Sequence, residues 1–109
     1  MRRVILGAVG TRWSSTNRNG DVETFTDLHG RPTTHRPHIH TIFHGGGTGR
    51  VTVVATSRTG DHPFRVELRN ADGNAVRDAQ RDLARKLEAR DRLEHQRGRE
   101  RTRESQRDR

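Results

Sequence analysis

Cysteine and tyrosine are both absent from the 109 residues of this chain, and tryptophan occurs once, as Trp13. The lack of cysteine excludes disulfide bonds, thiolate nucleophiles and cysteine-ligated zinc sites. The scarcity of aromatic residues argues against a broad stacking platform for bases. No apolar run approaches the roughly 18 residues that cross a bilayer, so we expect no membrane contact and a cytoplasmic location.

Large apolar side chains are also scarce. Leu, Ile, Val and Phe together make up 20 of the 109 residues. A chain of this length forms one small domain, and this composition gives it a thin hydrophobic core. The sequence therefore excludes a multidomain enzyme and folds that enclose a large cavity.

Lysine is nearly absent, whereas arginine is abundant. Of the 22 basic residues only Lys86 is a lysine, and the 14 acidic residues leave a net charge of +8. A GC-rich genome produces such an arginine bias without any ligand, but the planar guanidinium also binds phosphate in a bidentate manner. Codon usage does not explain the excess of positive charge, which favours a polyanionic partner.

The first two thirds of the chain carry most of the β-branched residues and predict five short strands. Turns rich in Gly, Asn and Pro separate these strands. We expect the strands at residues 3–9, 22–28, 38–43, 50–57 and 64–69. The polar segment 10–19 is expected to form an irregular loop.

Two turns predict the register of the last three strands. A turn centred on residues 59–60 places Val53 opposite Val66 on one face. The same argument across the glycine-rich loop 45–49 places Thr41 opposite Val53. A slip of one residue would put apolar side chains opposite polar ones, so the three strands share one apolar face.

A long helix is predicted over about residues 74–96, with a turn and N-cap just before it. A narrow apolar stripe at helical spacing can cover the sheet, and it consists of Val76, Ala79, Leu83 and Leu87. Residues 97–109 contain six arginines and no large apolar residue, which predicts a helix extension or a disordered arm. The fold class is α+β, with a small antiparallel sheet or partly open barrel of about five strands followed by one C-terminal helix, and with residues 1–96 as the single domain.

Histidines and arginines occupy the opposite face of the same predicted strands. They are His38, His40, His44, Arg50, Arg65 and Arg69. Such a group is typical of a surface that binds RNA or DNA phosphates, and Arg97 and Arg99 would add contacts from the tail. We therefore predict a non-enzymatic nucleic-acid-binding or nucleoprotein-associated protein, with an acidic protein as the alternative partner.

The same face also has the residue types of a small metal-independent ribonuclease or toxin-like enzyme. His38, His40 or His44 would transfer protons, with Glu67 as their partner and Arg65 stabilising the charged transition state. His38 and His40 are about 6.5 to 7 Å apart along a strand, which would allow joint metal ligation. No aspartate near them in the sequence completes a site, so we predict no metal and no cofactor.

A third interpretation assigns the function to the helix. Leu93 lies off the main apolar stripe, where it would pack against a partner protein or a second copy of the chain. A nucleic-acid-binding protein, a ribonuclease and an interaction module are thus the three hypotheses that the sequence supports, in that order.

Overall fold

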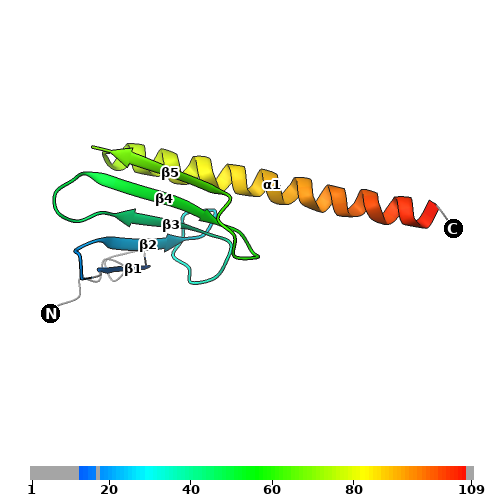
Figure 1. The fold of residues 1–109 in the computed structure, drawn as a ribbon, viewed down its shortest axis with the longest axis horizontal. Helices are drawn as coiled ribbons and strands as arrows, with labels where there is room; N and C mark the ends of the chain where they lie inside the picture. Colours follow the sequence, from blue (N-terminus) through cyan, green and yellow to red (C-terminus); the bar gives the residue numbers. More distant parts are fainter. Residues whose placement is uncertain (1–12, 17, 108–109) are drawn as a thin grey trace.

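The computed structural model describes residues 13–16 and 18–107, with the side chains of residues 18–99. In this part of the chain, five antiparallel strands form one sheet in the order β1-β2-β3-β4-β5. The strands are β1 (Trp13–Thr16), β2 (Val22–Thr26), β3 (His38–Phe43), β4 (Arg50–Thr56) and β5 (Phe64–Arg69), and the helix α1 (Gly73–Arg107) follows. Figure 1 shows α1 lying along the sheet and continuing past it.

An antiparallel sheet followed by one long C-terminal helix confirms the predicted α+β class. Four of the five predicted strands form, as β2 to β5. The predicted registers are also present, since Val53 pairs with Thr41 on one side and with Val66 on the other. The edge strands β1 and β5 do not contact each other, so the described strands form an open sheet rather than a barrel.

The N-terminal part of the sheet differs from the prediction. Residues 3–9, predicted as a strand, lie outside the described residues. The irregular loop predicted for 10–19 is wrong at Trp13–Thr16, which forms β1 and pairs with β2. The sequence Ser-Ser-Thr of this strand has no apolar alternation, so its hydrogen-bonding to the edge of β2 is what makes it a strand.

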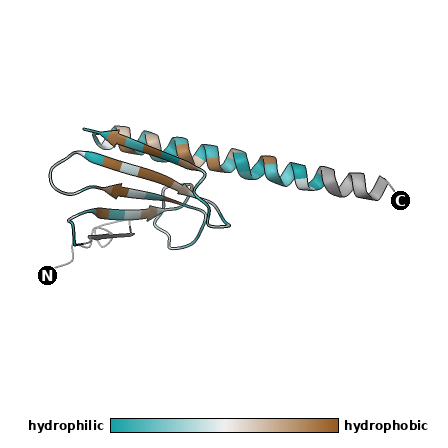
Figure 2. Ribbon diagram, in the orientation of Figure 1, coloured by the Kyte–Doolittle hydropathy of each residue, from teal (hydrophilic) through white to brown (hydrophobic). Residues whose placement is uncertain are grey.

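The core lies between α1 and strands β3, β4 and β5. Val76, Leu83 and Leu87 of the helix are buried against Ile39 and Val53 of the sheet. Figure 2 shows that hydrophobic residues concentrate on the strands and on the half of α1 beside them. The helix therefore covers one face of the sheet and leaves the other face free of it.

Asp72 caps the start of α1. Its Oδ1 atom accepts a hydrogen bond from the backbone N–H of Ala75 at 2.8 Å, and its carbonyl accepts one from Val76 at 3.1 Å. The first bond satisfies a donor that the first helical turn leaves without an intrahelical partner, and the second is the first regular hydrogen bond of the helix. No proline interrupts the chain beyond Asp72, and the helix continues through the arginine-rich segment to Arg107.

The helix makes the molecule long. Its 35 residues span about 52 Å at about 1.5 Å per residue. The molecule measures 65 × 25 × 22 Å, and its radius of gyration is 17.4 Å, whereas a compact domain of this length has about 13 Å. Within the described residues, the helix lacks the continuous apolar stretch that crossing a membrane requires.

Candidate functional site on the outer face of the sheet

The face of the sheet that points away from α1, here called the outer face, carries the predicted histidines and arginines. Strand pairing puts His40, Val54 and Arg65 side by side across three strands. His44 directly follows β3, and its backbone N–H donates to the carbonyl of Arg50 at 3.0 Å. The structure thus places His38, His40, His44, Arg50, Arg65 and Arg69 on one face, with His38 beside the end of β4 and the pair Arg50 and Arg69 at its start.

Phe25 of β2 adds an aromatic ring to this face. It lies opposite His40 in the sheet, and the two rings stack with centroids 4.3 Å apart and planes at 12°. The same phenyl ring meets His38 edge-on, with a centroid distance of 5.3 Å and an angle of 85°. Three rings from two adjacent strands therefore form one cluster, which we call the ring cluster.

Burial lowers the pKa of both histidines of the ring cluster below the usual 6.5. For His38, a backbone hydrogen bond with His35 partly opposes this effect. For His40, Glu23 opposes the effect of burial. Its Oε1 atom lies 3.4 Å from Nε2 of His40, which is close enough for an ion pair but does not form a well-aligned hydrogen bond. Because burial is the largest effect in both cases, the two rings are neutral near pH 7. Neither histidine ring of the cluster then adds positive charge to the outer face at that pH.

The carboxylates on and beside the outer face have local partners. Glu67 accepts a hydrogen bond from Arg65, with 2.9 Å between Oε1 and Nη2, and Arg65 lowers the pKa of Glu67. Asp21 places Oδ2 4.0 Å from Nδ1 of His44. Together with the Glu23–His40 contact, these contacts give each of three acids a local partner, and Arg65 neutralises one of them, Glu67.

Asp21, His44 and Thr52 form a chain of polar contacts. The Nε2 atom of His44 lies 2.7 Å from the Thr52 hydroxyl, while its other nitrogen faces Asp21. This order of groups is that of a carboxylate, a base and a nucleophile. Thr52 is only 3% exposed, however, so its hydroxyl is closed to a substrate and the contacts hold the β3–β4 hairpin together.

Arg50 and Arg69 are exposed cations of the outer face, and Glu67 on β5 is near enough to Arg50 for the arginine to help lower the pKa of Glu67. The two arginines lie directly opposite each other on β4 and β5. Neither forms an ion pair with a residue that the structure describes. Like charges at opposed positions of an antiparallel pair repel each other, and an anion bound between them would remove that repulsion.

Comparison of the chain with models of protein families, with curated proteins and with solved structures finds no match. Among the described residues, no group of three or more histidine, aspartate or glutamate side chains is placed to hold a metal ion.

Arg97 and Arg99, which the sequence predicts to contact nucleic acid from the tail, do not lie on the outer face. Both belong to the part of α1 that continues beyond the strands, and α1 packs on the opposite face of the sheet. Arg99 lines a groove beside the loop between β4 and β5, whereas Arg97 does not. The sheet face and the arginines predicted to add contacts from the tail thus lie on different surfaces of the molecule.

Sequence reasoning missed Asp21, Glu23 and Phe25, all of which come from β2 or the residue before it. The prediction that no aspartate completes a site with the histidines considered only residues nearby in the sequence. Asp21 lies beside His44 although 23 positions separate them. A register for β2 against β3 would have revealed these neighbours, but the long connection 27–37 does not define one.

Proposed function

We propose that this protein is a non-enzymatic nucleic-acid-binding protein that contacts RNA or DNA through the outer face of its sheet. The observation that carries this proposal is the opposed, exposed pair Arg50 and Arg69, neither of which forms an ion pair with a described residue. A nucleic-acid backbone presents a regular row of phosphates, and guanidinium groups bind phosphate oxygens with two parallel hydrogen bonds. Two adjacent, exposed guanidinium groups fit such a backbone.

The ring cluster supports a nucleic acid over an acidic protein. Phe25, His38 and His40 are partly exposed, and burial favours the neutral form of both imidazoles. The exposed parts of these uncharged rings, on an open antiparallel sheet, offer an apolar surface for contact with unpaired bases. An acidic peptide would gain nothing comparable from these rings.

The proposal is tested by measuring the fluorescence anisotropy of labelled single-stranded RNA and DNA oligonucleotides over a series of salt concentrations. We expect the double variant Arg50→Gln/Arg69→Gln to bind more weakly than the original chain. The slope of log affinity against log salt should fall by about 1.4, because each phosphate neutralised on a single strand contributes about 0.7.

The matched control is Arg81→Gln/Arg85→Gln, which removes two exposed arginines from α1 and leaves the outer face intact. It should change the salt slope much less. Equal effects of the two double variants would mean that net charge alone drives binding, and the proposal would then fail. A polyglutamate peptide that competes as well as the oligonucleotide would assign the face to an acidic protein instead.

A ribonuclease is the second candidate, and the approach of Glu23 to His40 favours it. Burial keeps His40 neutral near pH 7, which is the protonation state of a general base. Glu67, the partner predicted from the sequence, is ion-paired with Arg65. Cleavage of labelled RNA that is lost in both His40→Ala and Glu23→Gln, with folding intact, would establish this activity, and no cleavage by the original chain would eliminate it.

A further inference from the structure

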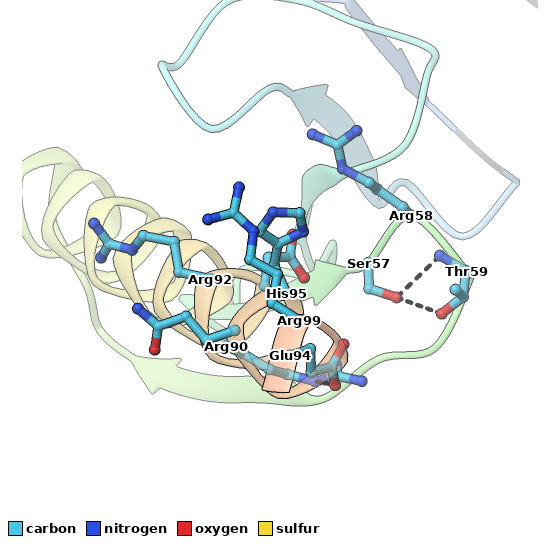
Figure 3. A pocket seen from close by; sticks show the side chains of 10 residues that line it. Ser57, Arg58, Thr59, Arg90, Arg92, Glu94, His95 and Arg99 are labelled. Carbon is cyan, nitrogen blue, oxygen red and sulfur yellow. Dashed lines mark hydrogen bonds and ion pairs between the residues drawn. The ribbon is translucent and has the colours of Figure 1, made fainter. Parts of the chain in front are cut away.

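A groove lies where α1 leaves the sheet, between the helix and the loop 57–63 that joins β4 to β5. Its volume is about 690 Å³. Figure 3 shows Ser57, Arg58 and Thr59 on the loop side and residues of the helix on the other side. No residue of the outer face lines this groove, so it is a separate surface of the molecule.

The loop side of the groove is held by a network around Asp61. Its carboxylate accepts hydrogen bonds from the hydroxyls of Ser57 and Thr59. Its Oδ2 atom lies 2.8 Å from Nη2 of Arg90, which ties the loop to the helix. These bonds lower the pKa of Asp61 to about 2. The Asp61–Arg90 ion pair therefore links the loop wall of the groove to its helix wall.

The helix side presents a stripe of basic groups. Arg92, His95 and Arg99 are spaced at i, i+3 and i+7, which places them on one side of a helix. Arg58 lies on the loop side of the same groove (Figure 3). Within the described chain, none of these three arginines forms an ion pair.

The groove remains positive when its acids are included. Four arginines and two carboxylates line it, which leaves a net charge of +2 without His95. One of those acids, Glu94, already accepts a hydrogen bond from Arg90 at 3.1 Å. The Nη1 atom of Arg90 is buried and has no hydrogen-bond partner among the described residues. Arg36 does not line the groove, but its guanidinium lies against Gly60 in the same loop.

We infer that this groove binds a phosphate-bearing anion through Arg58, Arg92 and Arg99. These three guanidinium groups line one groove of net positive charge and form no ion pair with a described residue. A phosphate bound there would offset this charge and accept several of their N–H bonds at once. The groove has the size of sites that hold small organic ligands rather than single ions. The phosphate belongs either to a free nucleotide or to a nucleic-acid backbone, and the inference does not depend on binding at the outer face.

The test compares Arg99→Gln with Arg97→Gln. Both variants remove one exposed arginine from the same helical segment, but only Arg99 lines the groove. Sodium pyrophosphate, adenosine diphosphate and a single-stranded oligonucleotide are titrated against each protein, and the amide resonances of residues 57–61 and 92–99 are followed by NMR. The dispersion of the spectra confirms folding.

We expect Arg99→Gln to weaken binding about tenfold, as the loss of one charge-assisted hydrogen bond does, and Arg97→Gln to change it less than about twofold. If adenosine diphosphate and pyrophosphate show this dependence on Arg99, the ligand is a free phosphate ester. If only the oligonucleotide shows it, the ligand is a nucleic-acid backbone. The same titrations with Arg50→Gln/Arg69→Gln separate the groove from the outer face, because that variant should keep the dependence on Arg99.

Three results would overturn the inference. They are equal effects of the two single variants on every probe, no binding of any phosphate compound, and binding of citrate as tight as that of pyrophosphate. The first two would show that the groove makes no contact of its own with phosphate. The third would show that it responds to negative charge alone.

Discussion

His40 lies between a phenyl ring and a carboxylate, and its surroundings act on its protonation in opposite directions. Burial among its neighbours, including the stacked Phe25, disfavours the imidazolium, while Glu23 favours it. Burial has the larger effect, so the pKa of His40 falls below 6.5. His38 behaves in the same way for the same main reason. The two histidines supply neutral rings at neutral pH and add charge to the outer face only on acidification.

The lowered pKa values of His38 and His40 make the stability of the fold depend on pH. Because the folded-state pKa values of His38 and His40 are lower than those of the unfolded chain, the unfolded chain binds more protons below about pH 6.5. The free energy of unfolding should therefore be highest above that pH and decrease as the pH falls through it. Urea unfolding at several pH values measures this. The variant His38→Gln/His40→Gln should flatten the dependence, and the exposed-loop variant His29→Gln should retain it.

Asp61 gives a second pH-dependent contribution, in a lower range. Its folded-state pKa of about 2 lies below the usual 3.8, so the carboxylate stabilises the fold above pH 3.8, and this stabilisation is lost as the pH falls toward 2. We expect Asp61→Asn to lower the melting temperature at neutral pH and to lose this part of the acid dependence. Circular dichroism melts across this range provide the measurement. Asp78 lies on the exposed side of α1 and serves as the control. If Asp78→Asn lowers the melting temperature as much as Asp61→Asn does, the network around Asp61 contributes no specific stability.

At the scale of elements, the length of the connection between two strands determines whether their register could be predicted from the sequence. The loops 44–49 and 57–63 are short, so the apolar faces of β3, β4 and β5 allow only one register, and the sequence predicts it correctly. The connection 27–37 is longer and defines no turn centre. The half of the site on β3 to β5 could therefore be predicted, while Glu23 and Phe25 could not be placed against His40.

The two ends of the chain show why local patterns were insufficient. β1 is short and polar, and its partner strand rather than its own composition determines its conformation. At the other end of the chain, the sequence has no proline to stop the helix near residue 96, and the helix continues to Arg107. The placement of Arg99 in a groove depends on that continuation, so the sequence could suggest a basic tail but could not separate Arg99 from Arg97.

Packing of α1 on the sheet depends on a few large side chains, which makes the core sensitive to truncation. Leu87 is 0% exposed and Leu93 is 48% exposed. We expect Leu87→Ala to cost about 2 to 5 kcal/mol in the free energy of unfolding, and Leu93→Ala to cost less than about 0.5 kcal/mol. Urea denaturation at several protein concentrations measures both. A large, concentration-dependent cost at Leu93 would instead support the interaction of this helix with a second copy.

At the scale of the whole molecule, the net charge of +8 is distributed over distinct surfaces. Arg50 and Arg69 lie on the outer face at the end of the sheet where β4 begins. Arg58, Arg92 and Arg99 lie at the other end of β4, on the side of the sheet that carries α1. About 20 Å of strand separates the two groups along β4. A flexible polyanion could contact both, whereas a small anion would occupy one.

The continuous helix also determines the size of the molecule in solution. Small-angle X-ray scattering should give a radius of gyration near 17 Å, because α1 holds its outer half away from the sheet. A value near 13 Å, typical of a compact domain of this length, would show that the outer half folds back on the sheet. Circular dichroism of the same sample would then report whether helix content is lost as well.

The elongation of this chain affects how its mass must be determined. Size-exclusion columns separate by hydrodynamic radius, and a rod experiences more drag than a sphere of equal mass. A single chain of 12.5 kDa and 65 Å in length should therefore elute early, in the position of a compact protein with a larger mass. Light scattering or sedimentation equilibrium, which report mass independently of shape, will distinguish one extended copy from two associated ones.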